Sequence, residues 1–406
     1  MDLISSIIGI IYCTLFEFFH GKSLLHSRIN KKNHKIYWYL LIIFRKNFKK
    51  FILKLGLDPW KYPTNNDLIK IRTTGKNDLK KFFSDESTSF LLRFLSIRLQ
   101  SSGSSGTPFE FRIFILQWIE EQARVYSSFR LAGYRIGKKM VVFRSYSPKN
   151  NEKNIKKIWW KRWTYFNSFA LDDKNLKKYY NYLKSENIKF LRTYPSTLST
   201  FLKFLKENDL KLNLKMIHCS SENIDEKLIS ESENYFGCKV INYYGQVEQA
   251  ILGINLINKS YINLLPYTSY YISSEDNSLI TLNLLNWTNP LVNYKVDDKV
   301  EQIKNNNFRI IGRTNLFLKH INGFEVSTVN FYTLMQRFDS LVKWQIFQSK
   351  NYDISINYEG DLVRDDTNTI EYEIKKRLGN LKISFNKNSF NYDGEGKINP
   401  IAIEKE

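Results

Sequence analysis

The first eighty-five residues carry apolar stretches that predict helices. Leu3–Phe19 is largely apolar, although two serines and Glu17 interrupt it and it is short for a bilayer span. Asp2 stands where a signal peptide has its positive region, and no small-residue cleavage site follows. We therefore expect a helix that packs on the body of the protein or lies on a surface.

Tyr37–Phe44 forms a second apolar block, and basic residues flank it on both sides. These residues are Lys31, Lys32 and Lys35 before it and Arg45, Lys46, Lys49 and Lys50 after it. The block has two interpretations: a core helix whose lysines point into water at its ends, or a helix at a membrane surface. The core interpretation is the more ordinary of the two.

Short apolar runs alternate with helical patterns in the middle of the chain. Residues 172–211 hold two helical patterns around the strand-like run that begins at Phe190, and Ser196 is placed to cap the second helix. A strand at Leu214–His218, a helix from about Glu226 and a strand opening at Val240 follow. Strands that alternate with helices indicate parallel pairing and an α/β fold.

The pattern becomes more strand-like after Thr281, and the last ninety or so residues have the size of a small α+β domain. We expect a large N-terminal domain of mixed sheets and helices over residues 1–312, whose first 60 residues form a helical segment. We expect a small, mobile C-terminal domain over residues 313–406.

Composition adds a strong positive charge to this outline. Lysine and arginine number 61 against 40 aspartates and glutamates, which gives a formal net charge of +21. Such a field favours anionic partners such as nucleotides or acidic lipids. The basic residues are spread along the chain, so we expect no nucleic-acid partner. The three cysteines form no CxxC pair, which argues against a disulfide framework or a structural zinc site and fits a reducing cytoplasm.

A loop of small residues interrupts two structured segments at Ser101–Gly106. Such loops expose the backbone N–H groups that bind phosphate chains, but the same composition is typical of flexible linkers. Its position between two apolar elements favours the phosphate loop. It lacks the Gly-Lys-Ser/Thr ending of a Walker motif.

Two further clusters are candidates for chemistry. Residues 241–248 end a strand with Tyr243, Tyr244, Gly245 and Glu248, which places an aromatic ring and a carboxylate at the edge where α/β sheets bind ligands. A buried tyrosine pair beside a surface glutamate would have the same sequence. Asp298 and, about fifteen residues later, Arg313 could bind ribose or phosphate oxygens, or could belong to a solvated turn.

The order and spacing of these segments resemble the adenylate-forming superfamily, over roughly residues 60–400. Within it they are most similar to the branch of phenylacetate-coenzyme A ligases and capsular polysaccharide biosynthesis proteins. Several ordered motifs are more specific than any single one. The motifs are, in chain order, Ser101–Pro108, Thr193–Ser196, Ser220–Glu222, Tyr243–Glu248, Asn293–Asp298, Gly312–Asn315, Asn322–Gly323 and Gly394–Ile398.

The resemblance implies a role for each matched residue. Ser101, Ser102, Gly103, Ser104, Ser105 and Gly106 would hold the β- and γ-phosphates of ATP, and Ser221, Glu222, Tyr243 and Gly245 would line the nucleotide pocket. Tyr244 would stack on adenine, and Glu248 would bind Mg²⁺. Asp298 and Arg313 would hold the ribose, while Lys397 would bridge the carboxylate and the α-phosphate. The domain rotation of the family would occur near Asn315.

The implied function is ATP-dependent activation of a small-molecule carboxylate as an acyl-adenylate, followed by acyl transfer to an acceptor. Coenzyme A or a sugar amine or hydroxyl is the expected acceptor, in surface polysaccharide synthesis. Val247, Asn293, Asp297 and Asn315 depart from the family pattern, and Asp297 adds a second carboxylate beside Asp298. These departures motivate an alternative, a non-catalytic protein that binds nucleotide. We expect a cytoplasmic protein, with an anionic membrane surface as a candidate partner.

Overall fold

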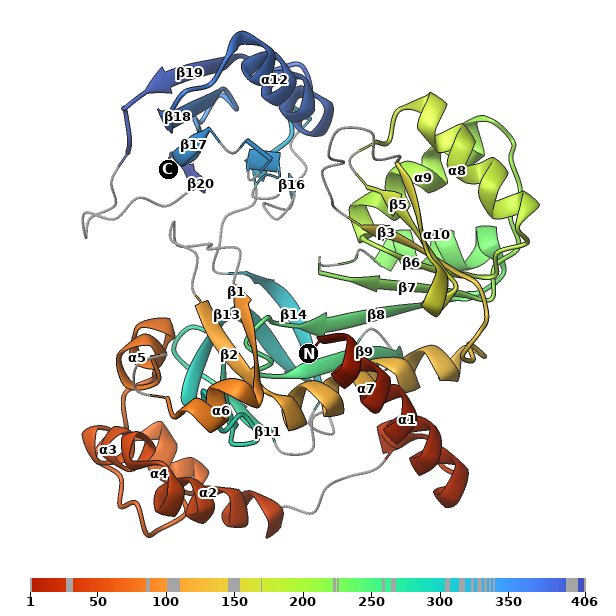
Figure 1. The fold of residues 1–406 in the computed structure, drawn as a ribbon. Helices are drawn as coiled ribbons and strands as arrows, with labels where there is room; N and C mark the ends of the chain where they lie inside the picture. Colours follow the sequence, from red (N-terminus) through yellow and green to blue (C-terminus); the bar gives the residue numbers. More distant parts are fainter. Residues whose placement is uncertain are drawn as a thin grey trace. The chain divides into compact units, whose positions relative to one another are not determined.

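The computed structural model describes most of the chain as two compact units (Figure 1). The described residues are 2–26, 32–84, 88–100, 110–144, 154–168, 170–221, 224, 226–257, 260–263, 268–303, 307–313, 318–322, 325–326, 331, 334–335, 337–338, 340–391 and 401–404. Unit 1 comprises Met1–Leu99 and Phe111–Ile311, and unit 2 comprises Gln100–Glu110 and Gly312–Glu406. Each unit is described by itself. The functional division predicted from the sequence, into an ATP- and acyl-binding domain and a mobile small domain, stays a prediction.

Unit 1 begins with helices, as the apolar stretches predicted. They are α1 (Asp2–His20), the 3₁₀ helix η1 (Leu24–His26), α2 (Lys32–Phe44), α3 (Lys46–Lys54), α4 (Asn65–Ile69), α5 (Lys76–Phe82) and α6 (Phe90–Phe94). The Tyr37–Phe44 block is part of α2, and Trp38, Leu41 and Ile42 are buried. The core interpretation therefore holds for that face of α2. Helix α3 is amphipathic and buries Phe48, Phe51 and Ile52 while its lysines point outward.

A twelve-stranded sheet forms the centre of unit 1, in the order β11-β12-β13-β14-β10-β9-β8-β7-β6-β3-β5-β4. The strands are β3 (Met140–Arg144), β4 (Ile155–Ile158), β5 (Trp163–Asn167), β6 (Phe190–Thr193), β7 (Met216–Ser220), β8 (Lys239–Gly245), β9 (Leu252–Ile257), β10 (Ser260–Asn263), β11 (Thr268–Ile272), β12 (Ser278–Asn283), β13 (Leu291–Ile303) and β14 (Asn307–Arg313). Strands β5, β3, β6, β7 and β8 are parallel, and β9 turns back antiparallel to β8. The predicted α/β alternation is confirmed.

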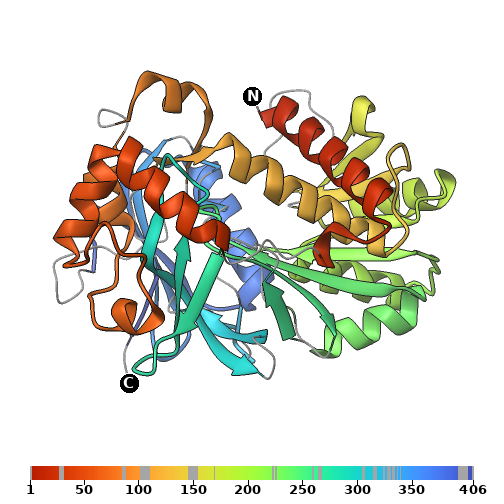
Figure 2. The same cartoon turned by 90° about the horizontal axis from the view of Figure 1, so that it is seen from below.

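Helices cover both faces of the parallel strands (Figure 2). Alternate residues along each strand face opposite sides: Val141 and Leu191 pack with the helices α8 (Asp173–Ser185), α9 (Pro195–Glu207) and α10 (Glu226–Phe236). Met140 and Phe190 instead face α7 (Ile115–Leu131) and α1. Helix α9 begins at Pro195 with Tyr194 as its N-cap, so the predicted cap at Ser196 was wrong. Proline suits the first helical position, and the helix therefore starts nearer the N-terminus than predicted.

A small sheet and one long helix make up most of the described part of unit 2 (Figure 1). Its four-stranded sheet has the order β19-β18-β17-β20, and α12 (Arg364–Leu378) buries Ile370, Ile374 and Leu378 in the core of the unit. The strands are β17 (Leu341–Gln348), β18 (Ile354–Gly360), β19 (Ile383–Lys387) and β20 (Ile401–Ile403). Short strands β15 (Leu318–Lys319) and β16 (Glu325–Val326) form a separate pair, as do β1 (Ser96–Gln100) and β2 (Glu110–Phe114) near unit 1's α7.

Helix α1 packs closely against α7, and Gly9 sits at the closest approach. A Cβ atom on Gly9 would lie 2.8 Å from the carbonyl oxygen of Ile119 and 2.9 Å from the Cβ of Gln122. Both distances are shorter than non-bonded atoms tolerate, and both atoms belong to or adjoin the α7 backbone. The two helices can therefore be this close only with glycine at position 9.

We predict that Gly9→Ala lowers the free energy of unfolding by about 1–3 kcal/mol, the usual cost of overpacking, because α1 must move away from α7. Urea unfolding measures the change. Ile8→Ala is the matched control, because Ile8 is the next residue and is exposed; it should change stability by less than about 0.5 kcal/mol. Equal effects of the two substitutions would contradict the close packing.

Candidate functional site

Two of the predicted nucleotide residues meet in unit 1. The hydroxyl of Tyr244, at the end of β8, donates a hydrogen bond of 2.7 Å to Oδ2 of Asp298 in β13. Asp298 is buried and also accepts a weaker contact of 3.5 Å from the side-chain amide of Gln246. The two residues are 54 positions apart in the sequence. The fold therefore brings a phenol and a carboxylate, both hydrogen-bonding groups, to one place.

An aromatic cluster fixes the ring of Tyr244. Its centroid lies 5.8 Å from that of Tyr261 and 5.7 Å from that of Phe308. Gly253, which pairs with Tyr244 across β8 and β9, makes room for this cluster: a Cβ there would lie 3.2 Å from Tyr261 and 3.3 Å from Phe308. The position of Tyr244 is thus set by packing before any ligand binds.

Glu248 lies in the turn that follows β8 and is buried. Its Oε1 atom lies 3.5 Å from the ammonium group of Lys76 and accepts a hydrogen bond of 3.4 Å from the hydroxyl of Tyr294. Lys76 starts α5, and Tyr294 belongs to β13, the strand of Asp298. Residues of β13 therefore contact both Glu248, through Tyr294, and Tyr244, through Asp298.

Asn293 holds the segment that precedes α5 against β13. Lys76, the first residue of α5, is thereby placed near Glu248. The side-chain amide of Asn293 donates to the carbonyl oxygens of Leu68, Ile71 and Arg72, and its Oδ1 accepts from the hydroxyl of Tyr271 at 2.7 Å. The backbone of Thr74 adds two hydrogen bonds to β13 at Asn293 and Lys295. Asn293 also has a φ of +51°, a left-handed conformation that asparagine tolerates better than most residues. This departure from the family pattern therefore has a structural role.

Tyr243 points to the opposite side of β8 from Tyr244, because side chains alternate along a strand. Its hydroxyl donates a hydrogen bond of 2.5 Å to Oε1 of Glu121 on α7. Burial, followed by the nearby Glu121, raises the pKa of Tyr243 well above its usual value. Burial likewise raises the pKa of Glu121 to about 7. A second buried group lies nearby: the rings of His218 and Tyr243 are 5.9 Å apart, and burial lowers the pKa of His218.

The raised pKa of Glu121 predicts a pH-dependent stability. Between its ordinary value of 4.5 and about 7, the unfolded chain has released the Glu121 proton and the folded chain still holds it. The unfolded state therefore binds fewer protons in this range, and stability falls as pH rises through it. We expect this group to contribute a loss of about 3 kcal/mol, at about 1.36 kcal/mol per pKa unit.

Glu121→Gln should remove that loss, since the amide does not titrate in this range and still accepts from Tyr243. Urea unfolding at pH values from 4.5 to 8 measures the difference between the two proteins. Glu301→Gln, on an exposed side chain of β13, is the control. If wild type and Glu121→Gln show parallel pH profiles, Glu121 ionises normally in the folded protein.

Comparison with solved structures finds crystal structures of 2-hydroxyisobutyryl-CoA ligase. In the postadenylation state, in complex with 2-HIB-AMP, this ligase is 14% identical to the chain with a TM-score of 0.54, and the match covers 92% of this chain and 90% of that one. The same ligase with 2-HIB-AMP and CoA in the thioesterification state gives the same values of 14%, 0.54, 92% and 90%. No family model matches the sequence, and no curated protein matches it.

The chain has the adenylate-forming ligase fold. At this level of identity the likeness concerns the fold, and it confirms the predicted fold class, a large α/β part with a small α+β part. The match extends along nearly the whole chain.

The adenylate-forming ligase fold brings together only some of the predicted site residues. Tyr244 and Asp298 are in contact, and Glu248 joins them through β13. Gly245 ends β8, and Ser221, exposed at the end of β7, has a φ of +72°. Ser101, Ser102, Gly103, Ser104, Ser105, Gly106, Glu222 and Lys397 lie outside the described residues, as does the side chain of Arg313. Their roles stay predictions.

Several polar residues at this site were not predicted from the sequence. Lys76 and Gln246 contact predicted site residues, and Glu121 contacts Tyr243. One sequence pattern could have drawn attention to Glu121. With Gln117, Arg124 and Ser128 it forms a row of polar residues at helical spacing in α7, and the structure buries all four. Polar groups on a buried helix need partners, which marks α7 as more than a packing element.

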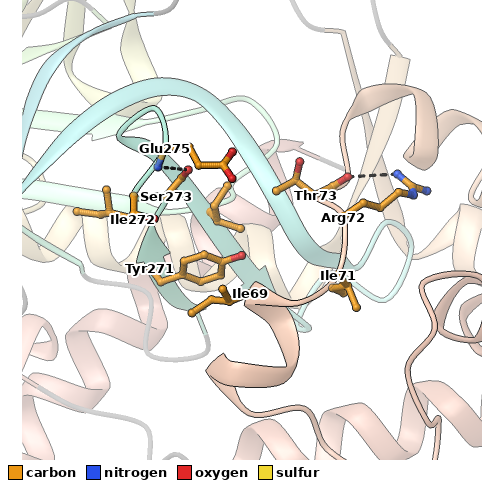
Figure 3. Close-up of a pocket in the computed structure, with 10 residues that line it drawn as sticks. Ile69, Ile71, Arg72, Thr73, Tyr271, Ile272, Ser273 and Glu275 are labelled. Carbon is orange, nitrogen blue, oxygen red and sulfur yellow. Dashed lines mark hydrogen bonds between the residues drawn. The ribbon is translucent and has the colours of Figure 1, made fainter.

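A cavity of about 390 Å³ is lined in part by Tyr271, the hydrogen-bond partner of Asn293 (Figure 3). It opens between the segment around Arg72 and the turn that joins β11 to β12, and Tyr271 is part of its wall. The guanidinium of Arg72 is ion-paired with Asp78 at 2.5 Å, so this positive charge is already engaged. Among the predicted site residues that the structure describes, none lines this cavity.

Proposed function

We propose that the protein is an ATP-dependent ligase that activates a carboxylate as an acyl-adenylate and passes the acyl group to an acceptor. A carboxylate oxygen forms a bond to the α-phosphorus of ATP, and the bond to the pyrophosphate leaving group breaks. The observation that carries the proposal is the contact between Tyr244 and Asp298, two residues selected from the sequence as nucleotide ligands, within an adenylate-forming ligase fold.

The proposed work of each residue follows from its chemistry. The buried carboxylate of Asp298 accepts hydrogen bonds, so it can hold the ribose hydroxyls while Tyr244 orients it. The ring of Tyr244 supplies a flat apolar surface for adenine. Lys397 would place a positive charge between the reacting carboxylate and the α-phosphate. Such a reaction depends on positioning and charge neutralisation more than on covalent catalysis.

The described residues fit a magnesium ion that is held mainly by the nucleotide. They contain no cluster of three or more metal-binding side chains, but Mg²⁺ usually binds one or two carboxylates together with substrate phosphates. Glu248 is a buried carboxylate in the turn that follows β8, next to the end of the strand that carries Tyr244, and this position suits the role. Lys76 is the competing positive charge, and it must move aside when the ion binds. The ion would neutralise charge on the phosphates.

The acceptor and pathway are proposed from the resemblance of the motifs. The solved relative carries CoA together with an acyl-adenylate in one of its crystal structures, which supports CoA as the acceptor here. A sugar amine or hydroxyl, in surface polysaccharide synthesis, is the acceptor suggested by the phenylacetate-CoA ligase and capsular polysaccharide branch. We place the reaction in the cytoplasm, where ATP is available and cysteines stay reduced.

Isotope exchange between pyrophosphate and ATP tests the proposal. The purified protein is incubated with Mg²⁺-ATP, labelled pyrophosphate and single members of a panel of fatty, aromatic, sugar and amino acids. We expect label in ATP only when the correct carboxylate is present. CoA and amino sugars added to the same mixtures then identify the acceptor by the new product. If ATP binds but no acid supports exchange, adenylation is the wrong reaction.

A second candidate is a protein that binds nucleotide without turnover. The ion pair between Lys76 and Glu248 favours it, because a lysine ammonium at 3.5 Å occupies the side of the carboxylate that a metal would use. Under this candidate ATP binds equally well with EDTA and with Mg²⁺. Under adenylation, Mg²⁺ should strengthen ATP binding, and Glu248→Gln should abolish that gain.

A further inference from the structure

Helix α1 packs on the protein through its small and polar side. Ser5, Ser6, Gly9 and Cys13 are buried, and Gly9 lies against the backbone of α7. Further along α1, Glu17 accepts a hydrogen bond from Ser127 and pairs with Arg130 at 2.7 Å. Small residues with a few polar contacts are typical of helix pairs in which apolar side chains face outward.

The opposite side of α1 exposes its large apolar residues. The exposed side chains are Leu3, Ile4, Ile7, Ile8, Ile11, Leu15, Phe18 and Phe19, and Phe18 and Phe19 are 79% and 74% exposed. Their spacing of three and four residues puts them on one face of the helix. Only 22% of the residues in Leu3–His20 are buried. The pattern is the reverse of a helix in the core of a water-soluble protein.

Helix α6 adds further exposed apolar residues at the start of α7. The amide of Ile115, at the start of α7, donates to the carbonyl of Leu95 at the end of α6, so the two helices adjoin. Phe90, Leu91 and Phe94 of α6 are exposed, as is Leu116 of α7. Both views show α1 beside α7 (Figures 1 and 2). We call the exposed residues of α1 and α6, with Leu116, the apolar face.

The helices around the apolar face carry positive charge with no acid of their own. In sequence, α2, α3 and α6 contain lysine, arginine and histidine but neither aspartate nor glutamate. Lys46, Lys50 and Lys54 share the exposed side of α3 with Leu53, and Ile43 and Phe44 are exposed at the end of α2. In Figure 2, α2 and α3 lie at the left of unit 1 and α1 lies at the upper right.

We propose that the apolar face and the lysines of α3 bind the surface of a membrane that contains anionic lipids. The exposed side of α1 lies among the headgroups and upper acyl chains, and the lysines contact lipid phosphates. Helix α1 lies along the interface and does not span the bilayer, because spanning would break its contacts with α7 at Gly9 and Glu17. A lipid surface fits better than a protein partner, because the exposed apolar side chains of α1 are long and lie on one face of the helix, and because α2, α3 and α6 of the same unit carry positive charge and no acid.

Vesicle flotation with the full-length protein tests the proposal. Vesicles of phosphatidylcholine alone are compared with vesicles in which phosphatidylglycerol replaces part of it. We expect binding to the anionic vesicles at low salt and at least tenfold weaker binding in about 1 M NaCl, where charges are screened beyond about 3 Å. Binding that resists both high salt and alkaline carbonate would show a spanning helix and overturn the interfacial arrangement.

Two variants separate the apolar and the electrostatic contributions. Ile4→Gln/Ile11→Gln/Phe18→Gln should weaken binding to anionic vesicles at least tenfold, because three inserted side chains become polar. Lys46→Gln/Lys50→Gln/Lys54→Gln should weaken it by about tenfold and leave weak binding to neutral vesicles unchanged. The matched control is Ile136→Gln/Trp159→Gln/Val363→Gln, three residues that are equally exposed elsewhere. The control should bind like the wild type.

Two results would overturn the proposal. The first is a wild-type protein that stays unbound with anionic vesicles at low salt. The second is a concentration-dependent dimer, seen by sedimentation, that the apolar triple variant abolishes while vesicle binding is absent; the face would then join two copies of the chain. Circular dichroism and ATP affinity of each variant establish that it is folded. Neither result depends on whether the protein forms adenylates.

Discussion

Replacing Lys397 with alanine should lower the rate of acyl-adenylate formation by a factor of about 10² to 10³, or about 3–4 kcal/mol, the usual cost of removing one preorganised group that stabilises charge. Lys397 follows Gly394 and Gly396 in the Gly394–Ile398 segment, which is similar to the segment that carries the catalytic lysine of adenylate-forming ligases. Its charge would act on the reacting oxygens and not on adenine or ribose. ATP affinity should therefore change far less than the rate.

Single-turnover formation of the adenylate, measured beside the ATP dissociation constant, separates the two effects. Lys382→Ala is the matched control, because Lys382 is an exposed lysine of unit 2. Acyl transfer from added acyl-adenylate should be nearly normal in Lys397→Ala, since that half-reaction uses a different arrangement of the domains in the family. An unchanged adenylation rate would remove Lys397 from the site and favour nucleotide binding without turnover.

The α/β centre of the fold could be predicted because its signals are local. Buried parallel strands such as β7 read as short apolar runs, and Gly237 ends the helix before β8. The α7 helix follows directly on β2, whose apolar residues alternate with polar ones. These patterns show which residues are apolar and how often they recur along the chain. This information is enough to assign helices and strands.

The orientation of α1 could not be predicted in the same way. Its apolar stretch predicted a helix, and the usual assumption puts isoleucine and leucine inside. The structure buries Ser5, Ser6 and Gly9 instead. The orientation of α1 depends on its neighbour α7. Helix α7 supplies polar partners such as Ser127 and Arg130, and it approaches α1 so closely that only small residues fit between them. A single helix does not contain that information.

The candidate site was predicted in part, and what was missed depends on contacts between distant segments. Tyr244 and Asp298 meet although β9, β10 and β14 lie between β8 and β13 in the sheet order, and local patterns do not show such a contact. Tyr243 and Tyr244 were assigned to one pocket, although alternation along β8 points them to opposite faces. Asn293 was seen only as a departure from the family, whereas the structure uses its amide to bind three carbonyl oxygens.

Asp298→Asn should weaken ATP binding by a factor of about 10² to 10³. Each hydrogen bond from a ribose hydroxyl to a carboxylate contributes about 1.5–3 kcal/mol, and two such hydroxyls are available. The amide of asparagine has nearly the same shape but presents a donor and one neutral acceptor. Tyr244→Phe keeps the ring and removes only the hydroxyl that holds Asp298 at 2.7 Å, so it should weaken binding by about tenfold.

The ligand itself provides the sharpest control for this assignment, because 2′,3′-dideoxy-ATP lacks both hydroxyls that Asp298 would hold. Wild type should prefer ATP to the dideoxy analogue by a factor of about 10² or more, whereas Asp298→Asn should bind both with similar affinity. Glu301→Gln, an exposed carboxylate change in the same strand, should retain the wild-type preference. Urea unfolding shows whether the buried substitution also costs stability. If Asp298→Asn keeps the preference for ATP, the carboxylate does not contact the ribose, and its hydrogen bond with Tyr244 serves only the packing of β13.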